Sequence, residues 1–207
     1  MPHHKIGAYF SVKGAMLHGD HRHALAEEDG ECIGLAAASY RSSRTRDFLY
    51  IETLLVSEDH QGSPVTGQLL AALFGGIVKE RGEFPDLIAM KTYNARAYVL
   101  MRSFVEPGSG ALFYPEVDRD NSAAAEEMAA EIAEALGAGF DFDATHGVVP
   151  GGGGEVPGDF WPHFPASRDD RVNEFFRRHL TPQDRLLCFI DSSTAESKRS
   201  ICSRLGI

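Results

Sequence analysis

The chain has 207 residues, of which 43% are hydrophobic, and a formal net charge of −10. The hydrophobic share supports a folded core and excludes global disorder. The acidic balance, without any Lys/Arg cluster, argues against sequence-independent binding of nucleic acid. No apolar run approaches the ~20 residues of a membrane-spanning helix, and no signal peptide is visible. Three cysteines without paired spacing are typical of a reducing compartment, so we expect a cytoplasmic protein with no nucleic-acid or membrane partner.

The first part of the chain predicts a short helix followed by three antiparallel strands. The helix is expected around residues 7–17. Two β-rich runs, residues 23–28 and 31–41, flank Asp29-Gly30, which is a strong signal for a two-residue hairpin turn. Residues 48–56, FLYIETLLV, predict the third strand.

This third strand leads through a polar loop directly into a helix. Gly62 and Gly67 allow close approach of the loop backbone, Pro64 suits a first helical turn, and the helix is expected to open at Gln68. Such a loop leaves backbone N–H groups unpartnered beside the positive end of a helix dipole, an arrangement that suits a phosphate or pyrophosphate. The segment therefore favours a cofactor with such a group, and the alternative is an ordinary strand–turn–helix connection.

A second strand–helix unit follows, and a longer and less regular part completes the chain. The unit consists of a buried strand at residues 86–92 and a helix at 94–104 with one apolar face. The later elements expected are a strand at 111–114, a helix at 122–136, a glycine loop at 151–154, a helix at 171–180, a strand at 185–190 and a polar, basic surface segment at 192–207.

The loop after the third strand resembles motif A of the GCN5-related N-acetyltransferase (GNAT) superfamily. In that family the loop amides hold the pyrophosphate of coenzyme A, and the strand backbone pairs with the pantetheine arm. Two usual loop glycines are replaced, by Pro64 and Thr66. The residues that match the motif are Val56, Gln61, Gly62, Val65 and Leu69.

The second strand–helix unit resembles motif B of the same family. Asn94 matches an asparagine that contacts the pantetheine arm in the family, and its alternative role is that of a helix N-cap. Tyr98 is either a packed aromatic residue or a cofactor contact. Met101 stands at the position where many members have a tyrosine as general acid, and methionine cannot donate a proton.

The resemblance covers residues 22–104 and implies a GNAT-like α/β fold. This fold has a mixed, mostly antiparallel sheet flanked by helices, with splayed central strands and here a long C-terminal extension. Residues 1–207 would form a single acyltransferase-like domain, with a cofactor-binding core at 22–104, a diverged part at 105–191 and a tail at 192–207. The residues implied to bind acetyl-CoA are Leu55, Val56, Gln61, Gly62, Ser63, Val65, Thr66, Gly67 and Asn94.

The implied activity is transfer of an acetyl or other acyl group from acyl-CoA to an amine, with acetyl-CoA as co-substrate. The acceptor would be a small-molecule or protein amine, the acidic balance weakly favours a cationic one, and a homodimer is a further expectation. The alternative is a catalytically inactive binding or regulatory module, because loop glycines and the tyrosine are replaced.

Glu52 is the best candidate for the base that accepts the proton of the attacking amine, and several family members place a glutamate on this strand. Strict alternation would put Glu52 on one face with Leu54 and Val56. The alternative is an ion-paired strand glutamate. A backbone N–H near Leu55 and Val56 is the candidate oxyanion donor.

No metal cofactor is expected. His18, Asp20, His21 and His23 lie close together in the sequence, with His3-His4 nearby, but nothing downstream completes a set of ligands.

Overall fold

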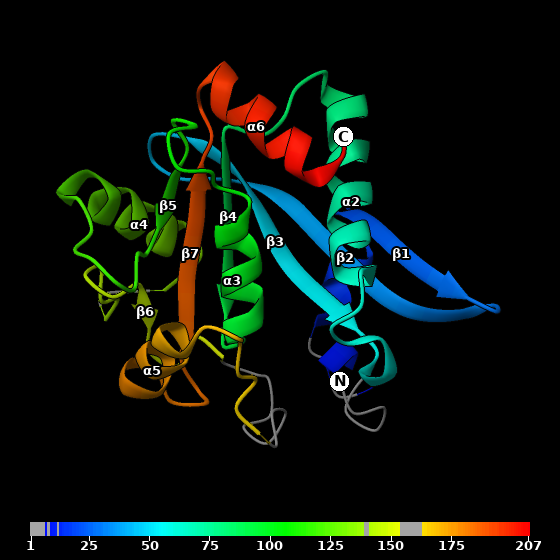
Figure 1. Cartoon of the computed structure of the whole chain (residues 1–207), viewed down its shortest axis with the longest axis horizontal. Coiled ribbons are helices and arrows are strands. Elements are labelled where there is room, and N and C mark those ends of the chain that lie inside the picture. Colours follow the sequence, from blue (N-terminus) through cyan, green and yellow to red (C-terminus); the bar gives the residue numbers. More distant parts are fainter. Residues whose placement is uncertain (1–6, 8, 12, 139–140, 154–162) are drawn as a thin grey trace.

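A seven-stranded sheet forms the centre of the protein (Figure 1). The computed structural model describes residues 7, 9–11, 13–138, 141–153 and 163–207. The strand order is β1-β2-β3-β4-β7-β5, and β6 also pairs with β7. All pairs are antiparallel except β3–β4, which is parallel. The strands are β1 Arg22–Glu28, β2 Glu31–Ser42, β3 Asp47–Val56, β4 Leu87–Thr92, β5 Leu112–Tyr114, β6 Val148–Val149 and β7 Arg185–Asp191.

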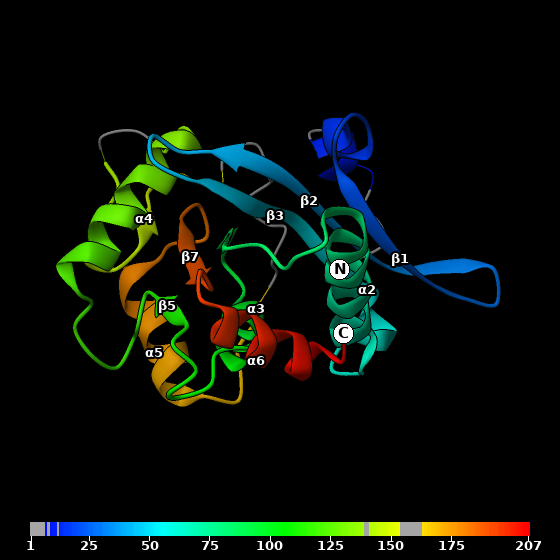
Figure 2. The ribbon, with the colours of Figure 1, turned by 90° about the horizontal axis from the view of Figure 1, so that it is seen from above.

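Helices cover both faces of this sheet (Figure 2). Helices α2, α3, α5 and α6 enclose the larger core on one face, and α4 packs on the other face against residues of β3, β4 and β7. The helices are α2 Val65–Arg81, α3 Ala95–Ser103, α4 Ala123–Ala135, α5 Asp170–His179 and α6 Ala195–Leu205, with 3-10 turns η1 Gly14–Leu17 and η2 Glu58–His60. The predicted fold class is therefore confirmed.

The sequence signals explain the elements that hold the site. Asp29 and Gly30 both have positive φ, 51° and 82°, as a two-residue hairpin turn requires, and they join β1 to β2. Helix α2 begins at Val65, three residues before the predicted start, because Pro64 already has helical angles (φ −64°, ψ −11°). The described residues between Gly7 and Lys13 are helical, as expected.

The C-terminal segment differs from its prediction as a surface tail. Thr194 caps α6 through a reciprocal capping box with Ser197, and Gly206 ends the helix with a φ of 73°. Ile201 is fully buried in the larger core and Leu205 is nearly so. Residues 195–205 are therefore part of the folded core.

Among the described helices, none combines the length and the apolar character needed to span a membrane.

Candidate active site

Strands β3 and β4 separate halfway along their length, and this gap defines the site. Their parallel pairing covers Leu49 with Ile88, Tyr50 with Ala89 and Ile51 with Met90, and no pair follows. Strand β3 continues to Val56 while it remains paired with β2. The predicted splay of the central strands is therefore present, and it leaves one edge of residues 52–56 open.

A β-bulge at Glu52 corrects the predicted orientation of this residue. Ala37 pairs with Thr53 and Ala38 with Ile51, so Glu52 is an extra residue opposite β2. Leu54 and Val56 pack on the larger core with α2, whereas Glu52 accepts a hydrogen bond from Ser39 and interacts with Arg41 and His21. Strict alternation fails here because the bulge inserts one residue. Glu52 therefore does not share a face with Leu54 and Val56.

The bulge also sets which backbone amides of β3 face the gap. Ser57 N donates to Ile33 O at 2.9 Å, so amides that alternate with it, including that of Leu55, point toward β2. The amide of Val56 then points to the open edge. Of the two predicted oxyanion donors, Leu55 and Val56, the register of β3 with β2 leaves only the Val56 amide at the open edge.

The loop between β3 and α2 presents several unpartnered amides. Gln61 N donates to Glu58 O and Ser63 N to His60 O, both at 3.2 Å, so these two amides are used within the turn. Within the described chain, no hydrogen bond is made by the N–H groups of Gly62, Thr66 and Gly67. These three donors lie at the N-terminus of a 17-residue helix, where an anion is favoured.

Asn94 and Tyr98, the two candidate cofactor contacts in motif B, have different surroundings. Asn94 caps α3, because its side chain accepts from Arg96 N at 2.9 Å, and it also lines the cavity at the gap. Tyr98 is fully buried and donates to Pro115 O at 2.7 Å. Burial raises the pKa of Tyr98, and Met101 is buried beside it in the same core. Tyr98 is thus a packed core residue.

A cavity of about 150 Å³ lies in the gap between β3 and β4. Met90, Asn94 and Ala97 line it on the α3 side. On the opposite face it is lined by residues from the N-terminal helix, β3, β4, the glycine loop and β7: Tyr9, Lys13, Glu52, Thr53, Lys91, Gly152, Gly153 and Arg185. Gly154 lies outside the described residues. The cavity thus connects the two faces of the sheet.

Glu52 is the one carboxylate among the described residues of this lining. Its Oε1 accepts from Ser39 Oγ at 2.9 Å and from Arg41 Nη2 at 2.7 Å, and His21 Nε2 lies 3.7 Å away. Oε2 makes no hydrogen bond or ion pair with another described residue. One oxygen is therefore anchored by an ion pair, and the other can accept a proton.

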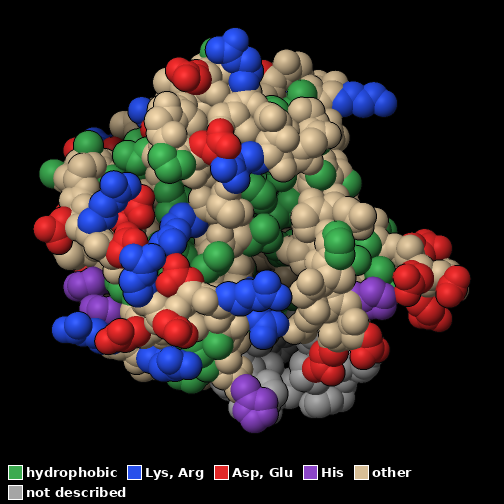
Figure 3. Space-filling model, viewed as in Figure 1, with side chains coloured by type: hydrophobic (Ala, Val, Ile, Leu, Met, Phe, Trp, Pro, Cys, Tyr) green, Lys and Arg blue, Asp and Glu red, His purple; other side chains and the backbone are tan. Residues whose placement is uncertain are grey.

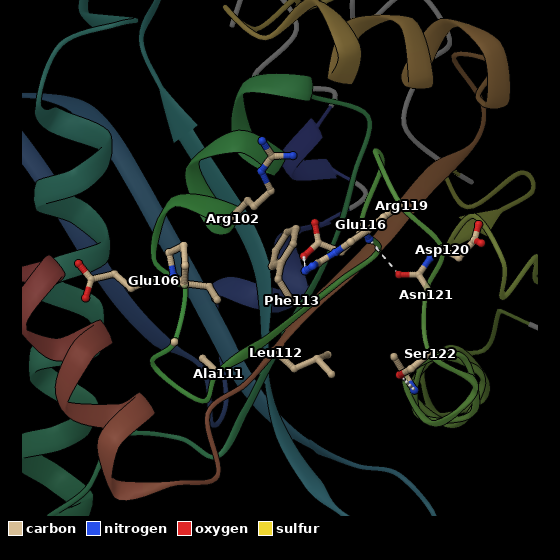
Figure 4. Close-up of a pocket in the computed structure, with 14 residues that line it drawn as sticks. Arg102, Glu106, Ala111, Leu112, Phe113, Glu116, Arg119, Asp120, Asn121 and Ser122 are labelled. Atoms are coloured by element: carbon tan, nitrogen blue, oxygen red, sulfur yellow. Dashed lines mark hydrogen bonds and ion pairs between the residues drawn. The ribbon is translucent and has the colours of Figure 1, made fainter.

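A larger cavity, of about 720 Å³, lies between α3, β5 and α4 and is separate from the gap (Figure 4). Its arginines are paired: Arg119 with Glu116 at 2.5 Å and Arg102 with Asp169 at 3.1 Å. Leu112 points into this cavity from β5, and Asn121 accepts from Glu116 N at 2.9 Å. It contains none of the residues matched to motifs A and B, so the smaller cavity is the candidate active site.

Four residues that line the cavity were not predicted from the sequence: Tyr9, Lys91, Tyr93 and Arg185. Lys91 was detectable as the single charge in a buried strand, LIAMKT, and Arg185 as the first residue of another. Tyr9 forms a short hydrogen bond with Thr53, and burial raises the pKa of Tyr9.

The histidines near the first strand do not form a metal cluster. His21 Nδ1 lies 2.9 Å from His18 O, and His23 Nε2 lies 2.7 Å from Met16 O. Within the described ranges, no group of three or more His, Cys, Asp or Glu side chains could hold a metal ion. His3 and His4 lie outside those ranges.

Comparison with known proteins found a family model that is similar to part of the chain. Residues 3–102 match the family model described as "Acetyltransferase (GNAT) family". No curated protein matched the chain.

Several solved structures are similar to the chain in part. A putative GNAT acetyltransferase from Desulfovibrio desulfuricans is 23% identical over 45% of this chain and 58% of its own, with a TM-score of 0.34. Escherichia coli ElaA is 21% identical over 55% and 69%, with a TM-score of 0.40. An aminoglycoside N-acetyltransferase in complex with CoA is 19% identical over 39% and 69%, with a TM-score of 0.29. The chain thus spans less than two thirds of the Desulfovibrio protein.

The matched segment ends at Arg102, so it contains the gap, the bulge and the loop before α2. Residues 3–102, just under half of the chain, are therefore similar to the acetyltransferase (GNAT) family.

Proposed function

We propose that this protein is an acetyl-CoA-dependent N-acyltransferase that acts on an amine. The observation that carries the proposal is the gap between β3 and β4 after Ile51 and Met90, with the unpartnered amides of the α2 N-terminus at the same end of β3. The co-substrate would supply the acyl group as a thioester. The cytoplasmic location and the homodimer stay predictions.

The residues present fit such a co-substrate. The N–H groups of Gly62, Thr66 and Gly67 would bind the pyrophosphate, assisted by the helix dipole. The remaining predicted contacts from this loop, Gln61, Ser63 and Val65, would surround it. Residues 54–56 of β3 would pair with the pantetheine arm along their open edge, and Asn94 would add its amide N–H.

On the opposite face, Glu52 would accept the proton of the amine through Oε2. A protonated amine is not nucleophilic, so a positioned base is needed as the amine nitrogen attacks the thioester carbonyl. The N–H of Val56 would stabilise the oxyanion that develops there. The amide bond then forms while the carbon–sulfur bond breaks.

One observation favours the second candidate, a binding module without catalysis. Met101 occupies the motif position of a general acid. The hydroxyl of Tyr98 is buried and donates its hydrogen bond to Pro115 O. No phenol from α3 therefore reaches the gap. Tyr93, which lines the cavity just before α3, is a phenol that could instead protonate a thiolate.

The test combines a thermal melt with a thiol-release assay on the full chain. Acetyl-CoA at ~100 times its Kd should stabilise the protein by about 2.7 kcal/mol. Release of free CoA thiol that depends on an added amine supports the enzyme. If acetyl-CoA stabilises the protein but no amine of a broad panel causes release of CoA thiol, the result favours the binding module. If acetyl-CoA neither stabilises the protein nor releases thiol, both functions are contradicted.

A further inference from the structure

Two basic side chains face the candidate active site from the face opposite α2 and α3. Lys91 is on the same side of β4 as Leu87 and Ala89, which pack with α4. Arg185 is likewise on the side of β7 that carries Leu187 and Phe189. Lys91 pairs with Leu187 across the two strands, so Arg185 is its diagonal neighbour on that face.

Neither cation has a carboxylate partner within the described chain. Arg185 is only 9% exposed, and both of its hydrogen bonds run from Nη1 to backbone carbonyls, of Pro182 at 3.0 Å and Asp184 at 2.6 Å. Lys91 makes no hydrogen bond or ion pair with a described residue. This distinguishes the site from the larger cavity, where both arginines are ion-paired.

The described lining of the cavity carries three cations and one carboxylate, so its positive charge is only partly compensated. Lys13 adds a third cation, and the carboxylate of Glu52 is already paired with Arg41, which does not line the cavity. Burial, then the charge of Lys13, lowers the pKa of Lys91, and the carboxylate of Glu52 opposes this shift. Burial also lowers the pKa of Arg185. A buried cation such as Arg185 is costly unless an anion pairs with it, so an anionic ligand is favoured beside it.

The acidic charge of the chain lies elsewhere. Exposed Glu27, Glu28, Asp29 and Glu31 gather at the outer end of the β1–β2 hairpin (Figure 3). The net charge of −10 therefore says little about the acceptor, because the local charge of the cavity has the opposite sign.

We propose that Lys91, Arg185 and Lys13 bind a carboxylate of the acceptor, which makes the acceptor a small zwitterion with its amine toward Glu52. This inference rests on the proposed acyltransferase function. The guanidinium presents parallel donors to a carboxylate, and the ammonium group adds a point charge. The cavity volume of about 150 Å³ suits a molecule of few carbons.

The binding test uses succinate as a probe and succinamide as its uncharged counterpart, measured by calorimetry on the acetyl-CoA complex of the full chain. Succinate should bind at least about tenfold more tightly than succinamide, since hydrogen bonds to charged groups are worth about 1.5–3 kcal/mol. Lys91→Met should remove most of that preference. Lys79→Met, an equal charge change on the exposed face of α2, should leave it unchanged.

The kinetic test compares three acceptors of equal length: 4-aminobutyrate, 4-aminobutanamide and 1,4-diaminobutane. The carboxylate should give the highest kcat/KM, by about tenfold or more, and Lys91→Met should abolish this advantage through KM. Equal use of all three, preference for the diamine, or equal binding of succinate and succinamide would overturn the inference. If Lys91→Met does not fold, the wild-type comparisons decide alone.

These results separate the two proposals. Acetyl-CoA binding and transfer to amines without a carboxylate preference would contradict only the zwitterion. Succinate binding that depends on Lys91, in a protein that transfers no acyl group, would contradict the acyltransferase and leave a carboxylate-binding site without an acceptor.

Discussion

Arg41 donates to Glu52 at 2.7 Å from outside the cavity, and it holds one oxygen of the carboxylate while the other is left for the substrate side. Ser39, which is buried, fixes the same oxygen at 2.9 Å. An ion pair and a catalytic role were competing interpretations of Glu52. The geometry makes them compatible, because the pairing orients the carboxylate without using both oxygens.

We expect Glu52→Gln to lower the rate of acyl transfer at neutral pH by roughly 10²–10⁴-fold, the usual contribution of a positioned general base. Affinity for acetyl-CoA should barely change, and raising the pH should recover part of the rate, because more amine is then deprotonated. Glu127→Gln, at an exposed position of α4, is the control. A wild-type rate for Glu52→Gln at every pH would show that another group accepts the proton.

Gly67 tests the pyrophosphate site better than Gly62, because Gly62 has a φ of 83° and any side chain there strains the loop. Gly67 lies in the first turn of α2 with open space around it. Gly67→Glu should weaken acetyl-CoA binding about fivefold or more, since charges 4 Å apart repel by about 1 kcal/mol even in water. A glutamate in the first turn stabilises the helix through the helix dipole, so the variant should remain folded.

The matched control for this variant is Gly76→Glu, an exposed position in the same helix. It makes the same change of charge and helix propensity, at about 13 Å from Gly67 by helical rise. Calorimetric titration of both variants measures the difference. Equal affinities for acetyl-CoA would remove the amides of residues 61–67 from the site.

Tyr98→Phe separates a core role from a cofactor role. Removal of the hydroxyl leaves the Pro115 carbonyl without its buried donor, so unfolding should become easier by about 1–3 kcal/mol. The kcat and the Kd for acetyl-CoA should stay at wild-type values. Tyr40→Phe, at a half-buried tyrosine that stacks under Arg81 at 3.7 Å, should change stability by less than about 0.5 kcal/mol. A changed kcat at wild-type stability would assign Tyr98 to the site.

Local signals in the sequence predicted the elements around the gap between β3 and β4 well. The Asp29-Gly30 turn, the strand–loop–helix unit and the Asn94 cap each depend on residues close in the chain, and each is present. The cavity residues on the opposite face of the sheet depend on partners that are distant in the sequence. Lys91 and Arg185 become neighbours only because β7 pairs with β4, and no local pattern encodes that pairing.

The error on Glu52 has a similar origin. A bulge is a property of two strands in register, and it reverses every later side chain relative to simple alternation. The sequence of β3 alone does not reveal the bulge, so simple alternation wrongly predicted that Glu52 shares one face with Leu54 and Val56.

His179 should make the protein less stable in mildly acid solution. Its ring stacks on His146 at a centroid distance of 4.2 Å, and His146 Nδ1 lies 2.7 Å from Asp143 Oδ2. Burial, then the charges of His146 and Arg178, lower the pKa of His179, with Asp143 opposing. The neutral ring is thus favoured on folding. Its stabilising contribution is complete above the unfolded pKa near ~6.5 and is lost as the pH falls through the lower folded pKa.

Denaturant titrations of wild type and His179→Gln between about pH 7 and pH 5 measure this effect. The wild type should lose stability more steeply over that range than the variant. Asp143, whose pKa is also lowered, titrates at more acid pH and does not interfere. His163→Gln, at an exposed histidine, should keep the wild-type slope. Parallel curves for wild type and His179→Gln would contradict the assignment.

Ile201 tests whether the last helix is part of the folding unit. Its side chain is fully buried against the larger core, although the surrounding sequence is polar and basic. Ile201→Ala should lower the free energy of unfolding by about 2–5 kcal/mol, the usual cost of such a cavity, and Ile201→Val by about 0.5–1.5 kcal/mol. Arg199→Ala, on the exposed side of α6, should change it by less than about 0.5 kcal/mol. Because Ile201 lies far from the cavity lining, affinity for acetyl-CoA in the folded variants should not change. If Ile201→Ala were as stable as Arg199→Ala, residues 195–205 would be a surface tail after all.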